Sequence, residues 1–224
     1  MTKKEKRAAI EKIVAVLKER YPDASCSLQY EGDPWRLFVM GRLSAQCTDH
    51  RVNIVSKELF KEIPTVEAMK DAPLSLIEEL VKPCGLYRVK AKNIRDAAEI
   101  LCRDFGGTVP SDMDALLSLP GVGRKIANLL RGDLFRIPGV VTDTHCIRIC
   151  GRLGMYPESE KRPETVEKIL TELIPKEEQT DFCHRIVFFG RDVCQARSPQ
   201  CEECPLASEG LCEKARKSKS KITL

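Results

Sequence analysis

The sequence lacks any run of about 18 apolar residues, the length that a membrane-spanning helix needs. It also lacks a charged-then-apolar leader with a small-residue cleavage site, so we expect an intracellular protein without a membrane segment. Apolar and polar residues nowhere alternate over a sustained stretch, which argues against β-strands. No repeat at solenoid spacing, no long low-complexity linker and no change in composition marks a domain boundary.

The charge balance excludes little. A net charge of +4, with 42% hydrophobic and 31% charged residues, describes an ordinary globular protein with a mild preference for anionic partners. Both ends are basic, at residues 2–7 and 214–221, and we interpret these runs as solvated termini.

The cysteines fall into two groups. Eleven is an odd number, which argues against a fully paired secreted framework. Most are scattered through apolar helical runs, where free cysteine behaves as a small buried hydrophobe. The others form the pattern Cys194-x6-Cys201-x2-Cys204-x7-Cys212, a strong metal signal. Thiolates in fours hold zinc or a [4Fe–4S] cluster, and zinc sites usually show two CxxC pairs where this chain has one.

What the sequence does contain is a succession of helical patterns, which predicts an all-α fold. Asp33-Pro34 and Thr48 are helix-start signals, and Gly106-Gly107 is a stop. Residues 111–114 resemble a capping box. The predicted helices cover about residues 3–20, 34–45, 66–82, 88–105, 124–131, 143–153, 163–173 and 180–191, with one more after Thr48 and a short one ending at Leu119.

The most informative segment is LPGVGRKIA at 119–127, followed by TDTH at 142–145. A glycine-punctuated turn between helices aims backbone N–H groups at a phosphate. Lys125 falls in the first turn of the second helix, where the dipole disfavours a positive charge, and a neutral amine is a nucleophile. Asp143 opens the next helix, where the same dipole favours a carboxylate. Alone, the segment would also fit a plain helix–helix loop ending in a surface lysine.

These residues resemble the endonuclease III family, which are DNA base-excision glycosylases with a helix-hairpin-helix. LPGVGRK, VTDTH at 141–145 and the cysteine pattern carry the resemblance, together with LSAQCTD at 43–49 and CGLY at 84–87 with Lys90-Ala91 after it. Order and separations fit over about residues 10–213.

The resemblance implies a bilobal α-helical fold. A six-helix barrel with the hairpin would cover 27–137, and an iron–sulfur lobe would combine 1–26 with 138–224. Lys125 from one lobe would face Asp143 from the other across the active-site cleft.

The resemblance also implies the chemistry. Lys125 would attack C1′ of a damaged nucleotide, with Asp143 deprotonating the lysine or stabilising charge on the sugar. The imine would allow β-elimination, which breaks the strand 3′ to the lesion. The expected function is a bifunctional glycosylase and AP lyase acting on oxidised pyrimidines of the thymine glycol type. The alternatives are a relative with another lesion or mismatch preference, and a noncatalytic iron–sulfur DNA-binding protein.

Further residues are assigned by the resemblance. Gln46 and Leu86 would fill the space vacated when the nucleotide is extruded. The amides at Gly121 and Gly123 would bind phosphate. His145 would approach a phosphate or hold its helix, whereas His184 is interpreted as a packing residue.

The four cysteines, Cys194, Cys201, Cys204 and Cys212, would hold a structural [4Fe–4S] cluster that shapes a DNA-touching loop with Arg197 as its phosphate contact. Three features depart from the family pattern: x7 before Cys212 where x5 is usual, Ile126 in place of threonine, and Thr142 in place of an apolar residue. The expected partner is double-stranded DNA with damaged bases or abasic sites, bound by a monomer in a prokaryotic cytoplasm or nucleoid.

Overall fold

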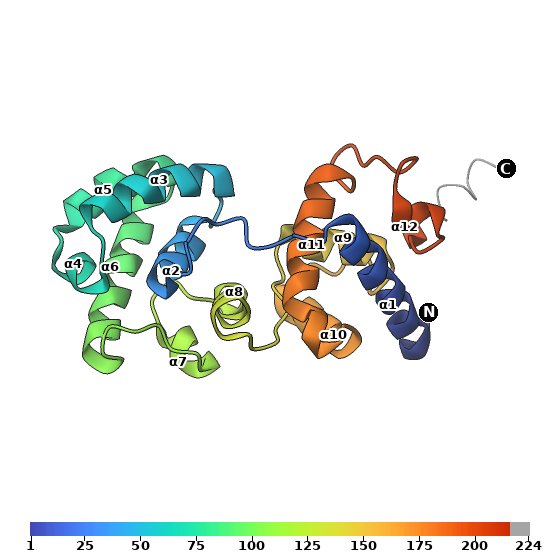
Figure 1. Cartoon of the computed structure of the whole chain (residues 1–224), viewed down its shortest axis with the longest axis horizontal. Coiled ribbons are helices and arrows are strands. Elements are labelled where there is room, and N and C mark those ends of the chain that lie inside the picture. Colours follow the sequence, from blue (N-terminus) through green and yellow to red (C-terminus); the bar gives the residue numbers. More distant parts are fainter. Residues whose placement is uncertain (216–224) are drawn as a thin grey trace. The chain divides into compact units, whose positions relative to one another are not determined.

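The computed structural model describes residues 1–215, so the basic positions from Arg216 to Lys221 lie outside the described residues. Within that range the chain is helical and forms no strand, which confirms the predicted all-α class. The α-helices are α1 (Lys3–Arg20), α2 (Pro34–Leu43), α3 (Asp49–Glu62), α4 (Val66–Asp71), α5 (Leu74–Val81), α6 (Tyr87–Asp104), α7 (Met113–Ser118), α8 (Arg124–Phe135), α9 (Thr144–Arg152), α10 (Pro163–Leu173), α11 (Gln179–Asp192) and α12 (Pro205–Ser208) (Figure 1). Short 3₁₀ turns cover Lys82–Cys84 and Lys176–Glu178.

Side-chain caps start most of the predicted helices where the sequence placed them. Asp33 accepts a hydrogen bond from the Arg36 amide, with Pro34 in the first turn of α2. Thr48 caps α3 in the same way. Each cap satisfies an N–H group that has no partner inside the helix. At α7 the cap is Asp112, whose carboxylate accepts from the Ala115 amide at 2.9 Å.

The predicted helix over 66–82 is wrong as a single element. The structure breaks it into α4 and α5 at Ala72-Pro73, where Ala72 has extended backbone angles. Pro73 has no N–H group, and its ring disfavours a helical conformation at the residue before it. The helical periodicity on both sides masked this break.

The chain divides into two compact units, which we call the middle unit and the end unit. The middle unit is Cys26–Ile137, and the end unit combines Met1–Ser25 with the described residues from Pro138 onward. The expected boundary would have placed Cys26 with the termini, whereas its contacts group it with the middle unit.

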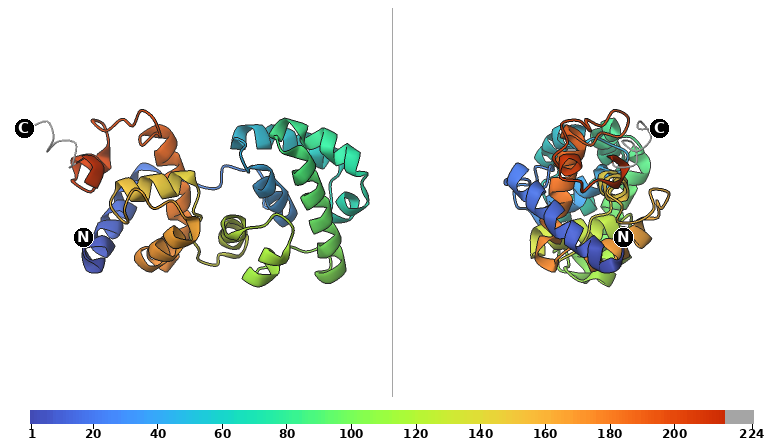
Figure 2. Two further views of the ribbon diagram at one scale, coloured as in Figure 1. Left: turned by 180° about the vertical axis from the view of Figure 1, so that it is seen from behind. Right: turned by 90° about the vertical axis from the view of Figure 1, so that its right-hand side faces the viewer.

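The middle unit is built around α2, which is apolar on nearly every side. Leu37, Phe38 and Val39 are fully buried, and the Trp35 ring stacks on Phe38 with centroids 5.3 Å apart. Helices α3, α6 and α8 pack against α2, and α4 and α5 lie along α6, as the left view of Figure 2 shows for α6 and its neighbours. A helix that is hydrophobic all round belongs in a core. This core carries α8 and the turn that precedes it.

The end unit joins the first helix to the last ones. Helix α1 packs on α10, α11 and α12, and α11 packs on α9. Ile10, Ile13 and Leu17 of α1 are fully buried against this second core. No described helix has the length and apolar character needed to cross a bilayer.

Candidate functional site

Helices α7 and α8 and the turn between them form the predicted hairpin in the middle unit. The turn closes with a hydrogen bond of 3.1 Å from the Val122 amide to the Leu119 carbonyl. Gly123 is the N-cap residue of α8; no side chain caps this end, and its first turn contains no acidic residue. Such a helix end favours binding of an anion.

The two hairpin glycines have different roles. Gly121 has φ of 78°, and a Cβ there would lie 2.3 Å from Nε of Arg42 and 2.5 Å from Nδ2 of Asn93. Gly123 has an extended backbone with φ of −106°, and a Cβ there would meet no atom within 4 Å. The tight turn therefore requires glycine at 121 and not at 123.

The side chains of Arg42 and Asn93 pack against this turn at Gly121. The sequence did not indicate either residue. With the Asn93 amide oxygen directed toward Arg42, it accepts from Nη2 at 2.9 Å and from Nε at 3.3 Å. Burial lowers the pKa of the Arg42 guanidinium. The only signal in the sequence is a polar residue on the buried side of α2 and of α6.

Lys125 is exposed in the first turn of α8, directly after the hairpin. The next residue, Ile126, is buried in the core of the middle unit and faces Gly41 of α2. Since consecutive residues on a helix face different directions, burial of Ile126 turns Lys125 toward solvent. Its amine is thus accessible at the start of α8, the helix end whose backbone amides have no side-chain cap.

Asp143 is the N-cap residue of α9 in the end unit. Its Oδ1 accepts a hydrogen bond of 2.7 Å from the Cys146 amide, and its own amide donates to the Val141 carbonyl. A charge-assisted bond of this length fixes the carboxylate in position. Lys125 and Asp143 thus come from different units, and their pairing belongs to the function proposed below.

Gln46 and Leu86 lie in two loops of the middle unit with unusual backbone conformations. Both residues are left-handed, with φ of 54° and 48°, and both are exposed; Leu86 keeps 57% of its surface accessible. Neither is glycine, so each conformation is strained. Strain of this kind collects at functional sites.

Lys90, which the family resemblance includes without giving it a role, joins these two loops. This lysine of α6 is fully buried, and its Nζ donates to the carbonyls of Leu43 and Cys84, both at 2.8 Å. Burial lowers its pKa. One ammonium group therefore holds the segment before Gln46 against the segment before Leu86, which makes Lys90 a positioning residue.

In the end unit, the structure brings Cys194, Cys201, Cys204 and Cys212 together around one cavity. Phe189, Val193 and Leu153 supply apolar wall. Burial raises the pKa of the Cys204 and Cys212 thiols. A metal that binds these thiols as thiolates must displace their protons, so binding is coupled to folding of this segment.

Four thiols that line one cavity supply the donor set used by both metals that the spacing allowed. The residues present therefore fit a [4Fe–4S] group, which takes four cysteine thiolates. The resemblance to the endonuclease III family favours iron–sulfur over zinc.

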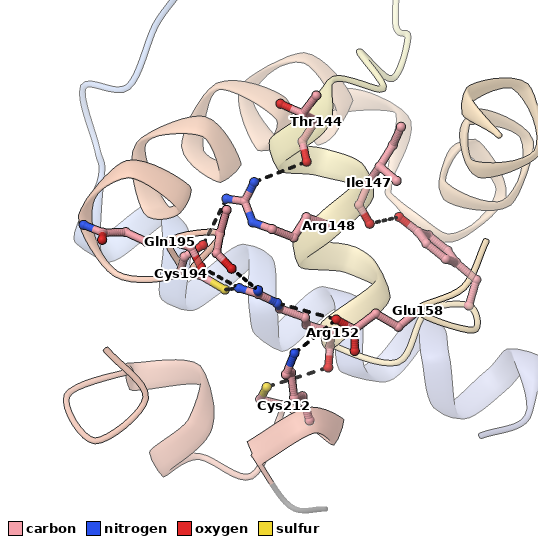
Figure 3. Close-up of polar contacts among 11 residues, drawn as sticks. Thr144, Ile147, Arg148, Arg152, Glu158, Cys194, Gln195 and Cys212 are labelled. Atoms are coloured by element: carbon pink, nitrogen blue, oxygen red, sulfur yellow. Dashed lines mark hydrogen bonds and ion pairs between the residues drawn. The ribbon is translucent and has the colours of Figure 1, made fainter. Parts of the chain in front are cut away.

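Two arginines of α9 hold the loop that bears the first cysteine (Figure 3). Arg152 donates to the carbonyls of Gln195 at 2.7 Å and Ala196 at 2.8 Å, and to Sγ of Cys194 at 3.4 Å. Arg148 donates to the Cys194 carbonyl at 3.0 Å. Burial lowers the pKa of Arg148. Helix α9 thus carries Asp143 at its start and supports the cysteine loop along its length.

His145 and Arg197 are placed differently. The ring of His145 lies within 3.2 Å of Arg148 and beside Gly190, where any side chain would collide with it. This arrangement supports the helix-holding role for His145. Arg197 is exposed in the loop between the first two cysteines, and its contact with DNA remains a prediction.

Comparison with known proteins agrees with this geometry. A family described as the HhH-GPD superfamily of base excision DNA repair proteins matches residues 39–176. The iron–sulfur binding domain of endonuclease III matches residues 194–209, a range that ends before Cys212.

Curated relatives match over nearly the whole chain. Endonuclease III of Bacillus subtilis is 43% identical over 203 residues, which is 91% of each chain. Endonuclease III of Escherichia coli is 37% identical over 201 residues, covering 90% of this chain and 93% of the relative. A solved structure of a non-covalent endonuclease III–DNA complex has a TM-score of 0.89 at 40% identity, covering 98% of this chain and 99% of that one. This chain therefore belongs to the endonuclease III family of HhH-GPD base excision DNA repair proteins, and its cofactor is a [4Fe–4S] cluster.

Proposed function

We propose that Lys125 and Asp143 carry out the reaction of this chain, which is that of a DNA glycosylase and AP lyase acting on oxidised pyrimidines. The observation that carries the proposal is the exposed amine of Lys125 at an uncapped helix start that follows a hairpin. A second solved relative, with a TM-score of 0.88 at 40% identity, is a trapped covalent intermediate between endonuclease III and DNA. A covalent intermediate with DNA requires a protein nucleophile, and Lys125 is suited to that role.

In the first step, Nζ of Lys125 forms a bond to C1′ of the damaged nucleotide as the bond from C1′ to the base breaks. Asp143 either takes a proton from the lysine or stabilises positive charge on the sugar, and its capping bond holds the carboxylate still for this task. Loss of the ring oxygen's bond to C1′ then gives an imine.

The imine makes the C2′ proton acidic. Its removal expels the 3′ phosphate by β-elimination, so the C3′–O bond breaks and the strand is cut 3′ to the lesion. Water then adds to the imine carbon and displaces the amine, which releases the cut strand and restores Lys125. If Asp143 accepted a proton in the first step, its carboxylate is restored when that proton is lost to solvent.

DNA binding would involve two kinds of contact. The amides at Gly121 and Gly123 bind phosphate without reading the bases, which suits an enzyme that must inspect any sequence. Gln46 and Leu86 enter the stack in place of the extruded nucleotide. Their exposure supports this assignment, and so does the bridge that Lys90 makes between the carbonyls of Leu43 and Cys84, in the segments that precede them.

The cluster would be held by Cys194, Cys201, Cys204 and Cys212. It supplies a structural crosslink that orders residues 194–212 and presents Arg197 to the phosphate backbone. Cys212 lies beyond the matched domain range, but its thiol lines the same cavity and donates to the Arg152 carbonyl at 3.7 Å. A Cys212→Ser protein with less than four irons per chain would support this ligand assignment.

The chain would act as a monomer, because one chain supplies both members of the proposed catalytic pair. It would act inside the cell, in the cytoplasm or nucleoid of a prokaryote. The monomer is checked by gel filtration of the protein alone and with duplex DNA.

Borohydride trapping on abasic duplex tests the nucleophile. The native protein should give a covalent protein–DNA complex, and Lys125→Gln should give none while still binding the duplex. Lys61→Gln removes an exposed lysine from α3 of the same unit and should trap normally. Equal trapping by Lys125→Gln and the native protein would refute the assignment.

A further inference from the structure

Arg42, in the last turn of α2, lies against the hairpin turn to which phosphate binding is assigned above. Its Nε and Cδ are 2.3 and 2.9 Å from the position that a Cβ on Gly121 would occupy, so the side chain contacts the backbone of the turn itself. Helix α2 packs on α8, the helix that the turn begins. The packing of these two helices therefore places a guanidinium at the hairpin.

The hydrogen bonds of Arg42 leave part of its guanidinium available. The Asn93 oxygen accepts from Nη2 at 2.9 Å and from Nε at 3.3 Å. This oxygen belongs to a neutral amide, so it satisfies two donors without neutralising the charge. Nη1 has no partner within residues 1–215, and it is not one of the buried polar atoms that lack one. This nitrogen is therefore open to solvent or to a ligand.

The charge of Arg42 also has no counterion in the protein. No Asp or Glu of the described part of the chain forms an ion pair with it, and burial lowers its pKa. The charged group that it does affect is a second cation, because Arg42 helps to lower the pKa of the Lys90 ammonium. A partly buried cation without a counterion loses solvation free energy. An anion bound at this turn would offset that loss.

Arg36, in the first turn of the same helix, shows the contrasting arrangement. Its guanidinium forms an ion pair with Glu31, lies 3.9 Å from the carboxylate of Asp33 and packs over the ring of Phe60. Its charge is thus neutralised within the protein. Because Arg36 and Arg42 are both partly buried on α2, Arg36 serves as the matched control.

We propose that Arg42 binds a DNA backbone phosphate at the hairpin and supplies the full positive charge that the backbone amides of this turn lack. The inference rests on the phosphate-binding role proposed for Gly121 and Gly123. An amide offers only a partial charge, whereas a guanidinium makes charge-assisted hydrogen bonds to phosphate oxygens that are roughly twice as strong as neutral ones. Such a contact raises the affinity for any sequence, because it reads no base.

The first experiment measures how the DNA affinity of the cluster-containing protein depends on salt. The duplex carries a tetrahydrofuran abasic analogue, which cannot form an imine, and binding is followed by fluorescence anisotropy. Arg42→Met keeps an apolar stem beside Gly121 and removes the charge. It should bind about fivefold to tenfold more weakly at about 0.1 M salt, and its plot of log affinity against log salt should be shallower by about one. Undamaged duplex should show the same change.

Three further variants separate the charge from the contact with the turn. Arg42→Lys and Asn93→Ala both lose the hydrogen bonds between residues 42 and 93 but keep the charge, so both should retain the native salt slope. Arg36→Met changes the net charge by the same amount and should also retain it, because this arginine is already paired with acids. Urea unfolding followed by Trp35 fluorescence shows whether each variant is folded, and Arg42→Gln replaces Arg42→Met if the latter is not. A native slope in a folded, neutral variant of Arg42, or an equal loss of slope in Asn93→Ala, would overturn the proposal.

The second experiment locates the phosphate. Neutral methylphosphonate linkages replace the phosphates of the duplex one at a time. The native protein should lose affinity at several positions, and Arg42→Met should be insensitive at one of them, because its contact there is already lost. Equal sensitivity of the two proteins at every position would refute a direct contact. Borohydride trapping by the native protein tests the proposed reaction separately: absence of trapping would refute that reaction, and the salt slopes would still decide the role of Arg42.

Discussion

At the scale of single residues, the two glycines of the hairpin motif differ in whether the structure requires glycine. LPGVGRK contains two glycines, yet only Gly121 has a left-handed backbone and a crowded Cβ position. The sequence indicated the hairpin and its lysine because turn chemistry is local. It did not distinguish the glycines, because the atoms that crowd Gly121 belong to Arg42 and Asn93, which are remote in the chain.

Gly121→Ala should therefore destabilise the middle unit by about 1–2 kcal/mol or more, from the left-handed backbone and the collision with Arg42. Gly123→Ala should cost less than Gly121→Ala, since the backbone at 123 is extended and the space open, and only the preference of an N-cap for glycine over alanine is lost. The single tryptophan, Trp35, lies in the core of this unit and reports its urea unfolding. Equal losses in the two variants would contradict the division of roles.

Asp143 caps α9, and we propose a chemical role for it as well; two substitutions separate the two roles. Asparagine keeps an oxygen to accept from the Cys146 amide, whereas alanine removes the cap. Asp143→Asn should unfold as the native protein does but turn over far more slowly, with little loss of DNA affinity. Asp143→Ala should lose activity and, in addition, about 1 kcal/mol of stability. Normal turnover by Asp143→Asn would exclude a role for the charge.

At the scale of elements, the helix starts were predicted from local signals, and the one wrong helix, over 66–82, has a local cause as well. Asp33-Pro34, Thr48 and Asp143 start helices as expected because a cap acts on its own first turn. The break at Pro73 was hidden by apolar spacing on either side of it. The brace at Lys90 could not be predicted, because a buried lysine is recognised only by the carbonyls it meets.

Lys90 provides a prediction on pH. Burial lowers its pKa below the ordinary value of 10.5, so the unfolded chain binds this proton more tightly than the folded one. This contribution to stability is therefore least favourable at low pH and rises as the pH increases from the folded pKa toward 10.5. Arg42, Cys47 and Cys84 are the charged and titratable groups around it.

Lys90→Met removes this titration together with both hydrogen bonds. The variant should be less stable at neutral pH by about 1–3 kcal/mol, since two buried carbonyls lose their donor. Its deficit relative to the native protein should grow as the pH rises through the alkaline range. Urea unfolding followed by Trp35 fluorescence at several pH values tests this, and a deficit that shrinks with pH would contradict the direction of the shift.

At the scale of the whole molecule, the proposed function depends on residues that no single segment contains. Lys125 and Asp143 come from different units, and the cluster cysteines come from the last stretch of the chain. Periodicity and capping placed each residue on its element, but the pairing came from resemblance over the whole chain. A net charge of +4 adds only mild attraction to DNA, so we expect recognition to depend on specific contacts such as the proposed insertion of Gln46 and Leu86.

The insertion of Leu86 is tested against a neighbour of similar exposure. Leu86 is 57% and Val89 is 56% exposed, and both lie at the start of α6. Leu86→Ala should lose activity on a paired lesion and retain much more of it in single-stranded or mismatched DNA, since an inserting side chain matters most when the base must be forced from a stable stack. Val89→Ala, which loses a comparable apolar surface, should leave both activities near native. If Leu86→Ala lowers activity equally on paired and unpaired substrates, or if Val89→Ala behaves like it, the surface is a packing or binding face and the wedge role is wrong.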